Sequence, residues 1–404
     1  MGEKTAVYWV QQNRKGACLM KIVVAIDSLK GSLSSLEAGA AIREGALRAD
    51  PDARVEVRPL ADGGEGTVEA LAAGMGGTLH KVTVTGPLGA PVECAYGILP
   101  DGVTAVVEMS GAAGITLIPA EERDPMRATT YGVGQVLRDA MSRGCRRFIV
   151  GIGGSATNDG GVGMLQALGF GFRDKAGRDI PGGAAGLAEL DAITTENVLP
   201  ELAECTFKIA CDVTNPLCGP KGCSAVYGPQ KGATPEMIRQ MDGWLARYAR
   251  LAARCRPETA DPDHPGTGAA GGLGFAFLTF TNAVLESGID IVLEETCLAD
   301  CLRDADLVVT GEGRLDGQTA MGKAPVGVAR LAKQYGKPVI AFAGSVTPDA
   351  AACNQAGIDA FFPILRGICT LEAAMDPDNA RRNMTDTAEQ VFRLWKAASG
   401  DTAV

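Results

Sequence analysis

Apolar runs of strand length alternate with longer amphipathic stretches near the start of the chain. Lys21 to Ile26 is such an apolar run, and it predicts a buried strand. Ser34 and Glu37 then have the spacing of a capping box, so we expect a helix from there to about Arg48. A further run from Val55 to Leu60 predicts the next strand. Strand, helix and strand in this order favour a parallel sheet with helices against its faces.

The same alternation returns towards the carboxyl end of the chain. The expected elements are strands at Leu307–Val309, Pro338–Phe342 and Ala360–Ile364, and helices at Val326–Gln334, from about Pro348, and at the terminus. Both ends therefore share one pattern, which predicts two halves of a single doubly wound α/β domain.

The middle of the chain has a different pattern, with short strands expected at 81–85, 92–98 and 104–108. Leu99-Pro100-Asp101-Gly102 is a hairpin turn signal between the last two. These features predict a mixed α/β unit inserted into the doubly wound domain. We place the discontinuous domain at 20–78 and 287–404, the inserted domain at 79–286, and an N-terminal extension at 1–19, with Met20 as a candidate natural start.

Composition narrows the class of protein. The 404 residues carry a formal net charge of −10, which offers no basic surface for nucleic acid or an anionic membrane. No apolar run approaches the roughly 20 residues that span a bilayer. The 12 cysteines fit no zinc-binding spacing, and buried reduced thiols are the better interpretation. We therefore expect a cytoplasmic protein whose partners are small molecules.

A glycine-rich run follows the apolar segment Phe148–Val150. It reads Gly153-Gly154-Ser155-Ala156-Thr157-Asn158-Asp159-Gly160-Gly161 and precedes an Ala/Leu-rich stretch. A strand, a glycine-rich turn and a helix start together aim backbone N–H groups at one point, which is typical of phosphate binding. Asn158 and Asp159 add side chains that can hold a metal ion or a hydroxyl. A tight turn with an Asn/Asp cap is the alternative interpretation.

Charged side chains follow several other expected strands. The runs are Asp27-Ser28-Leu29-Lys30-Gly31-Ser32, Asp62-Gly63-Gly64-Glu65-Gly66-Thr67, Asp212-Val213-Thr214-Asn215-Pro216 and Gly311-Glu312-Gly313-Arg314-Leu315-Asp316. Ligands of open α/β sheets bind outside the carboxyl ends of the strands, so we expect a site in the cleft between the two units. Lysine and arginine there suit anions, and carboxylates suit Mg²⁺ or proton transfer. Helix caps, turns and internal ion pairs are the alternatives.

Other reaction classes fit the inventory less well. Gly317 to Lys323 has the spacing of a P-loop, but Ala324 replaces the hydroxyl residue that would bind Mg²⁺. The two histidines, His80 and His264, give little support to a histidine base, and no Gly-x-Ser-x-Gly elbow occurs. The glycine-rich runs Tyr227–Gly232 and Gly266–Gly272 could approach a nucleotide or pack closely. Carboxylates, lysine and glycine loops together favour phosphoryl transfer.

At these residues the chain resembles the bacterial glycerate kinase family of the two-domain type, from Met20 to about Trp395. The resemblance is carried by the glycine-rich run at 153–161, by Ile26–Gly31, and by the runs at 62–67, 212–216, 227–232 and 310–316. It implies a flavodoxin-like domain interrupted by a second α/β domain. It also implies ATP-dependent phosphorylation of D-glycerate, with 2-phospho-D-glycerate favoured as the product. Only residues 1–19 depart from the pattern.

Our working hypothesis divides the candidate residues by role. The phosphates of ATP are bound by Lys30 and by the loop residues Gly153, Gly154, Ser155, Asn158 and Asp159. Mg²⁺ is bound by Asp212 and Glu312, and glycerate is bound by Arg314, Ser28 and Glu65. The base is Asp62, with Asp27 as the second candidate and Asp316 as the third. The alternatives are a glycerate 3-kinase, a kinase of a related hydroxy acid, and a non-catalytic regulator that binds nucleotide or sugar acid. Either a monomer or a homodimer fits the sequence.

Overall fold

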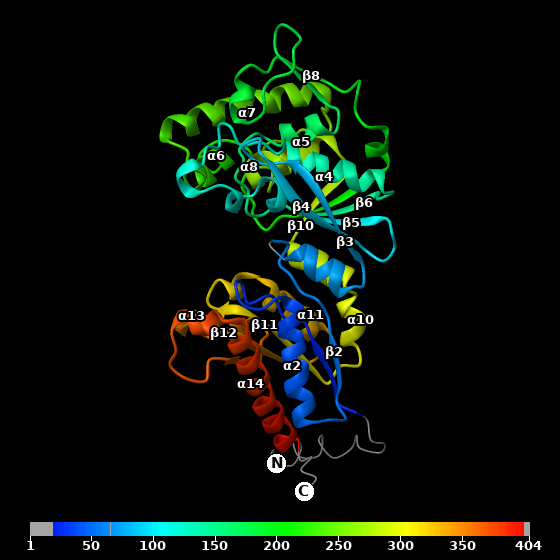
Figure 1. Cartoon of the computed structure of the whole chain (residues 1–404), viewed down its shortest axis with the longest axis vertical. Helices are drawn as coiled ribbons and strands as arrows, with labels where there is room; N and C mark the ends of the chain where they lie inside the picture. Colours follow the sequence, from blue (N-terminus) through cyan, green and yellow to red (C-terminus); the bar gives the residue numbers. More distant parts are fainter. Residues whose placement is uncertain (1–18, 65, 400–404) are drawn as a thin grey trace, which may run out of the picture. The chain divides into compact units, whose positions relative to one another are not determined.

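The computed structural model describes residues 19–64 and 66–399, and they form two compact units (Figure 1). Of the described residues, those up to Arg58 and those from Leu298 onward form the first unit, and those within Pro59–Cys297 form the second. The expected extension at 1–19 falls almost entirely outside the described residues. Within them, no helix is long and apolar enough to cross a membrane.

The first unit is built on a parallel five-stranded sheet with the order β13-β12-β11-β1-β2. Its strands are β1 (Lys21–Val24), β2 (Arg54–Val57), β11 (Leu307–Leu315), β12 (Val339–Val346) and β13 (Ala360–Pro363). The first strand lies beside a late one, since Ile22 is opposite Leu307. The two ends of the chain therefore complete one sheet, as their shared pattern predicts.

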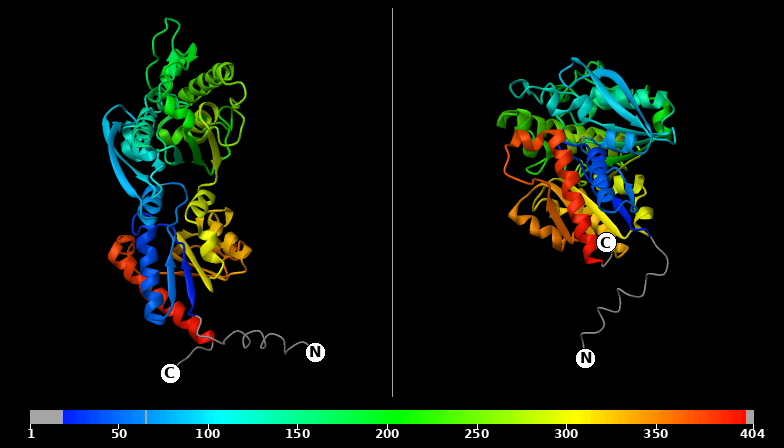
Figure 2. Two further views of the ribbon diagram at one scale, coloured as in Figure 1. Left: turned by 90° about the vertical axis from the view of Figure 1, so that its right-hand side faces the viewer. Right: turned by 60° about the horizontal axis from the view of Figure 1, so that its bottom comes forward.

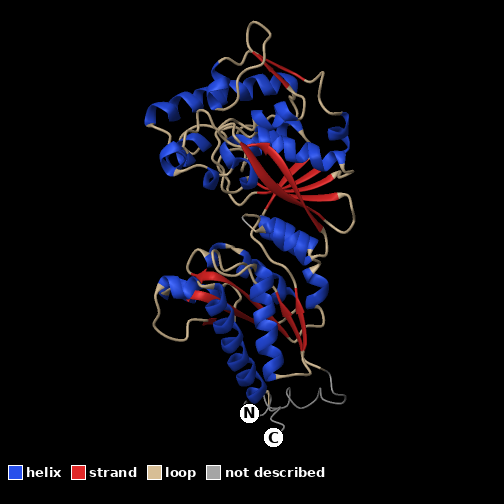
Figure 3. Cartoon of the chain, in the orientation of Figure 1, coloured by secondary structure: helices blue, strands red, loops and turns tan. Residues whose placement is uncertain are grey.

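Helices cover both faces of this sheet (Figure 3). The helices described in this unit are α2 (Ser35–Ala49), α10 (Leu298–Leu302), α11 (Ala324–Gln334), α12 (Ala352–Gln355), α13 (Leu371–Met375) and α14 (Pro377–Ala398). Ile22 and Val24 belong to the core formed with α2 and α14, whereas Val23 points to the other face and is also fully buried. A strand buried on both faces reads as a continuous apolar run, which explains the pattern from Lys21 to Ile26.

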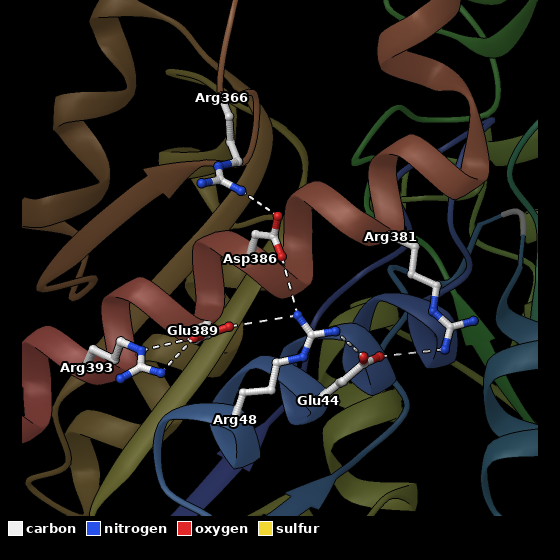
Figure 4. A network of polar contacts seen from close by, with 7 residues as sticks. All are labelled: Glu44, Arg48, Arg366, Arg381, Asp386, Glu389 and Arg393. Carbon is white, nitrogen blue, oxygen red and sulfur yellow. Dashed lines mark hydrogen bonds and ion pairs between the residues drawn. The ribbon is translucent and has the colours of Figure 1, made fainter.

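The helices α2 and α14 pack along each other, as both views in Figure 2 show. The expected capping box at Ser34 and Glu37 is present at the start of α2. An exposed ionic network links the two helices (Figure 4), through Glu44, Arg48, Arg366, Arg381, Asp386, Glu389 and Arg393. Arg48 is its centre: its guanidinium lies 2.7 Å from Glu44 and 3.4 Å from Asp386.

The second unit is built on a mixed six-stranded sheet with the order β10-β9-β6-β5-β4-β3. Its strands are β3 (Thr78–Thr85), β4 (Pro91–Ile98), β5 (Thr104–Glu108), β6 (Arg147–Gly151), β9 (Thr206–Ala210) and β10 (Ala283–Glu286), with β7 (Gly171–Arg173) and β8 (Ala192–Thr194) as a separate pair. The pairs β3–β4 and β4–β5 are antiparallel, and the pairs from β5 to β10 are parallel. The hairpin expected at 99–102 is therefore present.

The helices of the second unit enclose an aromatic core. They are α3 (Ser110–Ala113), α4 (Tyr131–Ser142), α5 (Val162–Ala167), α6 (Cys223–Tyr227), α7 (Pro235–Cys255), α8 (Ala269–Phe280) and α9 (Gly288–Glu295). Phe148 stacks on Phe207 with ring centroids 4.9 Å apart, and Tyr248 meets Phe275 edge to face. The two sheets and their helices confirm the predicted class, a doubly wound parallel α/β domain interrupted by a mixed α/β unit.

The units divide at different residues from those expected. Residues 59–78 and 287–297 belong to the second unit, whereas the sequence placed both stretches in the first. The π-helix Glu69–Ala73 packs on β3 and β4, and Val68 N donates a 2.7 Å hydrogen bond to Glu108 Oε1. The helix α9 packs on β9. Apart from the contact with the neighbouring β3, these contacts join segments well separated in the chain, so local patterning does not reveal them.

Two further elements differ from the expectations. The strand β11 continues to Leu315, although only Leu307–Val309 was expected, because it stays paired with β12 as far as Leu315 and Val346. Glu312, Gly313 and Arg314 therefore lie on a strand and not on a loop. The helix expected from Pro348 is a 3-10 turn followed by the short helix α12.

Candidate active site

A cavity of about 410 Å³ lies in the second unit, beside the carboxyl ends of the neighbouring strands β6 and β9. Ile152, Gly153 and Gly154 line it from the segment after β6, and Cys211 and Asp212 line it from the segment after β9. Parallel neighbours present their carboxyl ends at one edge, which is where α/β sheets bind ligands. The structure thus brings two of the sequence-predicted runs together.

Among the described residues, the carboxylates of the cavity lining are Asp62 and Asp212. Asp62 Oδ1 accepts a 2.9 Å hydrogen bond from Gly64 N. Asp212 Oδ1 accepts bonds from Ser287 Oγ at 3.0 Å and Gly288 N at 3.1 Å. Burial raises the pKa of the Asp212 carboxyl, and the nearby charge of Asp62 raises it further, whereas the Gly288 N–H opposes the shift. A cation in this cavity would relieve that repulsion.

A glycine holds the Asp62 turn against the end of β9. Gly63 has a φ of +83°, and a Cβ there would lie 2.6 Å from Ala210 Cβ and 2.9 Å from Gly288 Cα. A side chain would therefore push the turn away and would also be strained at this φ. The close approach of the backbone is what places Asp62 on the same cavity as Asp212.

Ser155 and Lys231 form a second polar group on the cavity wall. Lys231 Nζ donates to Ser155 Oγ at 2.7 Å and to the carbonyl oxygen of Thr157 at 2.6 Å. Burial lowers the pKa of Lys231 to about 8, while the neighbouring Cys223 thiol and Asp159 carboxyl act in the opposite direction. Ser155 was expected at a ligand; Lys231 was given no role.

Asn158 and Asp159 lie in the interior and do not line this cavity. Asp159 Oδ2 accepts from Thr130 N at 2.8 Å and Thr130 Oγ1 at 2.9 Å, and Gly161 N donates to its Oδ1 at 3.1 Å. Burial raises its pKa, against the effect of these donors. Asn158 Nδ2 donates to Ser224 Oγ. Both side chains tie the loop to its surroundings, which is closer to the turn-and-cap alternative than to ligand binding.

The helix after this loop is short, and it begins too far along the chain from Gly153–Ser155 for its first turn to bind a phosphate there. The loop runs on to Gly161, and α5 begins at Val162 with six residues. Its dipole is correspondingly weak and acts only close to its own first turn. The backbone groups and the hydroxyl near Gly153, Gly154 and Ser155 are therefore the parts of the loop that remain suited to a ligand.

The remaining candidates belong to the first unit. Asp27 is buried just after β1, and its Oδ1 accepts from Ser28 N at 2.7 Å. Asp27 N donates to the carbonyl of Gly311, and a Cβ on Gly313 would lie 3.6 Å from Lys30 N. The turn after β1 and the end of β11 are therefore adjacent. Lys30 is exposed on that turn.

The charged residues at the end of β11 interact with one another. Arg314 Nε lies 3.7 Å from Asp316 Oδ2, and the Arg314 side chain is 65% exposed. Lys323 Nζ lies 4.0 Å from Asp316 Oδ1. Asp316 Oδ1 also accepts from the Gln318 N–H. Glu312 Oε1 accepts from Thr319 Oγ1 at 2.5 Å. The open position of Arg314 leaves its guanidinium accessible to an anion. Glu65 lies outside the described residues.

The donor set fits Mg²⁺ better than a structural metal. No group of three or more His, Cys, Asp or Glu side chains that could hold a metal occurs in the part of the chain that the structure describes. Mg²⁺ is usually held by one or two carboxylates together with substrate phosphates and water. Asp212, with Asp62 on the same cavity, meets that requirement within the second unit.

Comparisons with known proteins agree with this picture. The family model described as the glycerate kinase family matches residues 22–396. A Haemophilus influenzae protein named glycerate kinase is 46% identical, over 93% of this chain and 98% of the relative. An Escherichia coli protein named glycerate 2-kinase is 48% identical, over 88% and 93%.

A solved structure has the same fold. It is a crystal structure from Salmonella typhimurium LT2, described as a candidate glycerate kinase 2, with a TM-score of 0.88 and 49% identity. The match covers 95% of this chain and 100% of the solved chain. Sequence and structure thus agree over nearly the whole length, and the chain belongs to the glycerate kinase family of enzymes.

Proposed function

We propose that this protein transfers the γ-phosphoryl group of ATP to the 2-hydroxyl of D-glycerate, giving 2-phospho-D-glycerate and ADP. The observation that supports it most directly is the 48% identity with a protein named glycerate 2-kinase, over most of both chains. The cavity of the second unit adds chemistry of the required kind, because it combines two carboxylates with a lysine and a serine hydroxyl.

The proposed reaction forms a bond between the glycerate oxygen and the γ-phosphorus and breaks the bond from that phosphorus to the bridging β,γ-oxygen. ADP leaves with the electron pair of the broken bond, and the hydroxyl proton moves to a base. Asp62 is the first candidate for this base because it is a carboxylate on the cavity wall. Positioning and charge stabilisation supply most of the catalysis in such transfers.

The other roles keep the assignment made from the sequence. Asp212 would hold Mg²⁺, which would neutralise phosphate charge; Glu312, the other metal candidate from the sequence, belongs to the first unit. Lys30 is assigned to the phosphates and Arg314 to the glycerate carboxylate, since a guanidinium binds carboxylate through two N–H groups. Asp27 and Asp316 remain the second and third candidates for the base. Asn158 and Asp159 are left out because they do not reach the cavity.

The direct experiment measures ADP formation from Mg·ATP with and without D-glycerate, followed by phosphorus NMR of the product. Glycerate-dependent turnover and a 2-phosphoglycerate signal are expected. Product that is 3-phosphoglycerate alone, with no mutase present, would replace the proposal by a 3-kinase. Faster turnover of another hydroxy acid would change the substrate, and binding without any turnover would favour the regulator.

The base is tested by exchanging each candidate carboxylate for its amide. Asp62→Asn should lower kcat by about 10² to 10⁴, because general base catalysis contributes roughly that factor. Asp290→Asn is the matched control, since Asp290 is exposed on the same unit and lies near Asp212. If Asp27→Asn or Asp316→Asn shows the larger loss and Asp62→Asn does not, the base belongs to the first unit.

We also propose a cytoplasmic location for the protein, with ATP and D-glycerate as its partners. A monomer and a homodimer are both compatible with the sequence, and sedimentation at several protein concentrations distinguishes them.

A further inference from the structure

We infer that Lys231 and Ser155 act as a donor pair that binds an anionic oxygen of a substrate in the cavity of the second unit. This inference rests on the proposed function, because it adds a substrate-binding residue to that reaction. The anionic oxygen belongs either to the carboxylate of the hydroxy acid or to a phosphate of the nucleotide, and both offer the same acceptor chemistry.

The first argument is the way in which the charge of Lys231 is buried. Its side chain lines the cavity, yet the residue is only 2% exposed. Both acceptors of its hydrogen bonds, Ser155 Oγ and the Thr157 carbonyl, are neutral. Within the described ranges, no carboxylate forms an ion pair with it. A buried ammonium without a counter-charge is unfavourable, and an anion in the cavity would supply that charge.

The same chain contains a buried lysine with a different arrangement. Lys21 is 7% exposed in the first unit, where it pairs with Asp304 and with Glu56 at 3.5 Å. That is how a lysine with a structural role is usually compensated. Lys231 lacks such partners among the described residues and lies on a cavity, which is the position expected for a residue that meets an external anion.

The second argument is the set of donors that remains available. An ammonium carries three N–H groups, and two of those of Lys231 are used. Ser155 Oγ accepts from Lys231, so its own O–H is directed elsewhere, and Ser155 also lines the cavity. One N–H and one O–H are thus left for a ligand, side by side on the wall.

The backbone around Lys231 is held in place. Gly232 follows it with a φ of +92°, and a Cβ there would lie 2.4 Å from the carbonyl oxygen of Arg123. Only glycine fits this close approach without strain. The ammonium itself is held by its bonds to Ser155 and Thr157, so ligand binding need not order a long flexible side chain.

The titratable and charged groups around Lys231 and Ser155 come from several elements. Asp159 lies on the loop after β6 and Cys223 on α6, and both influence the pKa of Lys231. Asp62 and Asp212 line the same cavity, and Arg123 donates to the carbonyl of Gln230 beside it. The carboxylates of Asp62 and Asp212 would repel an anion. The donor pair together with a metal ion would offset that repulsion and bind the anion.

The test is Lys231→Met, with Lys221→Met as the matched control. Lys221 is exposed on the same unit, and the structure gives its side chain no hydrogen bond or ion pair. Steady-state kinetics would be measured with D-glycerate and Mg·ATP varied in turn, and calorimetry would measure the binding of Mg·ADP. Ser155→Ala gives a second, smaller change, with circular dichroism to check that each variant folds.

Contact with the glycerate carboxylate predicts a rise of about 10- to 100-fold in KM for glycerate with unchanged Mg·ADP affinity. Contact with a phosphate predicts a fall of about 100-fold or more in kcat, with weaker Mg·ADP binding if the contact is made in the ground state. Ser155→Ala should show a weaker form of the same pattern. If Lys231→Met folds and its kcat and KM equal those of Lys221→Met, the inference is overturned. If Lys231→Met does not fold, wild-type kinetics in Ser155→Ala would overturn it instead.

A binding measurement separates this inference from the proposed function. If the wild-type protein does not turn over D-glycerate, calorimetry with inorganic phosphate, D-glycerate and Mg·ATP still reports on the anion site. Binding that is lost in Lys231→Met and kept in Lys221→Met would support the donor pair even without glycerate kinase activity. Equal binding by both variants would overturn it.

Discussion

Each unit contains a buried lysine, and the two lysines are compensated differently. In the first unit, Lys21 is buried against carboxylates, while Arg48 and Arg314 remain open to solvent with 47% and 65% exposed side chains. In the second, Lys231 is buried at a cavity with neutral partners. A cation that is already compensated mainly supports the fold. One that lacks a counter-charge, or that stays exposed at a strand end, is better suited to meet a substrate.

Lys30 provides the largest expected effect in this comparison. It is exposed on the turn after β1, so its loss should leave the fold intact. If it neutralises charge on the transferring phosphoryl group, Lys30→Met should lower kcat by about 100-fold or more, equivalent to about 2.7 kcal/mol. Lys337→Met, in the same unit, is the control. A variant with near-native kcat would remove Lys30 from the chemistry.

The two buried lysines should respond differently to the same substitution. Lys21→Met removes partners of Glu56 and of the Cys301 carbonyl, so it should lower the free energy of unfolding by about 1–3 kcal/mol. Lys231→Met removes a poorly compensated charge and should leave that free energy nearly unchanged or raise it. Urea denaturation of both variants measures the difference. Equal losses would mean that Lys231 is as structural as Lys21.

The pH dependence of stability gives a further distinction. The folded pKa of Lys231 is about 8, below the ordinary value of 10.5, so the unfolded chain binds more protons between these values. The stability of the wild type relative to Lys231→Met should therefore rise with pH across this window, by up to about 1.4 kcal/mol per pH unit. Buried thiols such as Cys94, with a pKa of about 12, act in the opposite direction.

Comparison with the variant cancels most of that thiol contribution, because both proteins contain the same cysteines. The measurement is the difference in urea-unfolding free energy at about pH 7.5 and about pH 9. Lys221→Met should show no such change relative to the wild type. A difference for Lys231→Met that stays constant with pH would mean that Lys231 keeps its ordinary pKa.

The ionic network of Figure 4 should give the smallest effect. Arg48 joins α2 to α14 but is half exposed, and exposed ion pairs contribute about 0–1 kcal/mol. Arg48→Met should therefore lower the unfolding free energy by less than about 1 kcal/mol, and less still at high salt. Arg43→Met, exposed on the same helix, is the control. A loss well above that limit would show that the network acts as more than separate surface pairs.

The positions of the site residues were only partly predictable. Asp62, Asp212, Gly153, Gly154 and Ser155 could be selected because they follow apolar strands, and the structure places all five on one cavity. Asp159 and Asn158 have the same sequence signal but are buried. A glycine-rich turn needs internal hydrogen bonds as much as a ligand does, so residue type alone does not separate these uses.

Lys231 is the opposite case, because it lines the cavity but was not singled out from the sequence. Its run, Tyr227–Gly232, stood out for its glycines, but nothing local distinguishes this lysine from an exposed one such as Lys221. Its contact with Ser155 joins residues 76 apart in the chain. Similarly, the charged run at 311–316 does not predict that Glu312 and Arg314 lie on a strand, because the strand conformation there depends on pairing with β12.

The sequence by itself determined the local pattern, the class of fold and the family. Side-chain periodicity follows from backbone geometry, so apolar runs and caps indicate strands and helices wherever they occur. Only the tertiary structure decided which polar groups are buried and what they contact, because burial depends on packing between distant segments. That is why the surroundings of Lys21 and Lys231 could not be read from the chain, although one has a carboxylate environment and the other lies on a cavity.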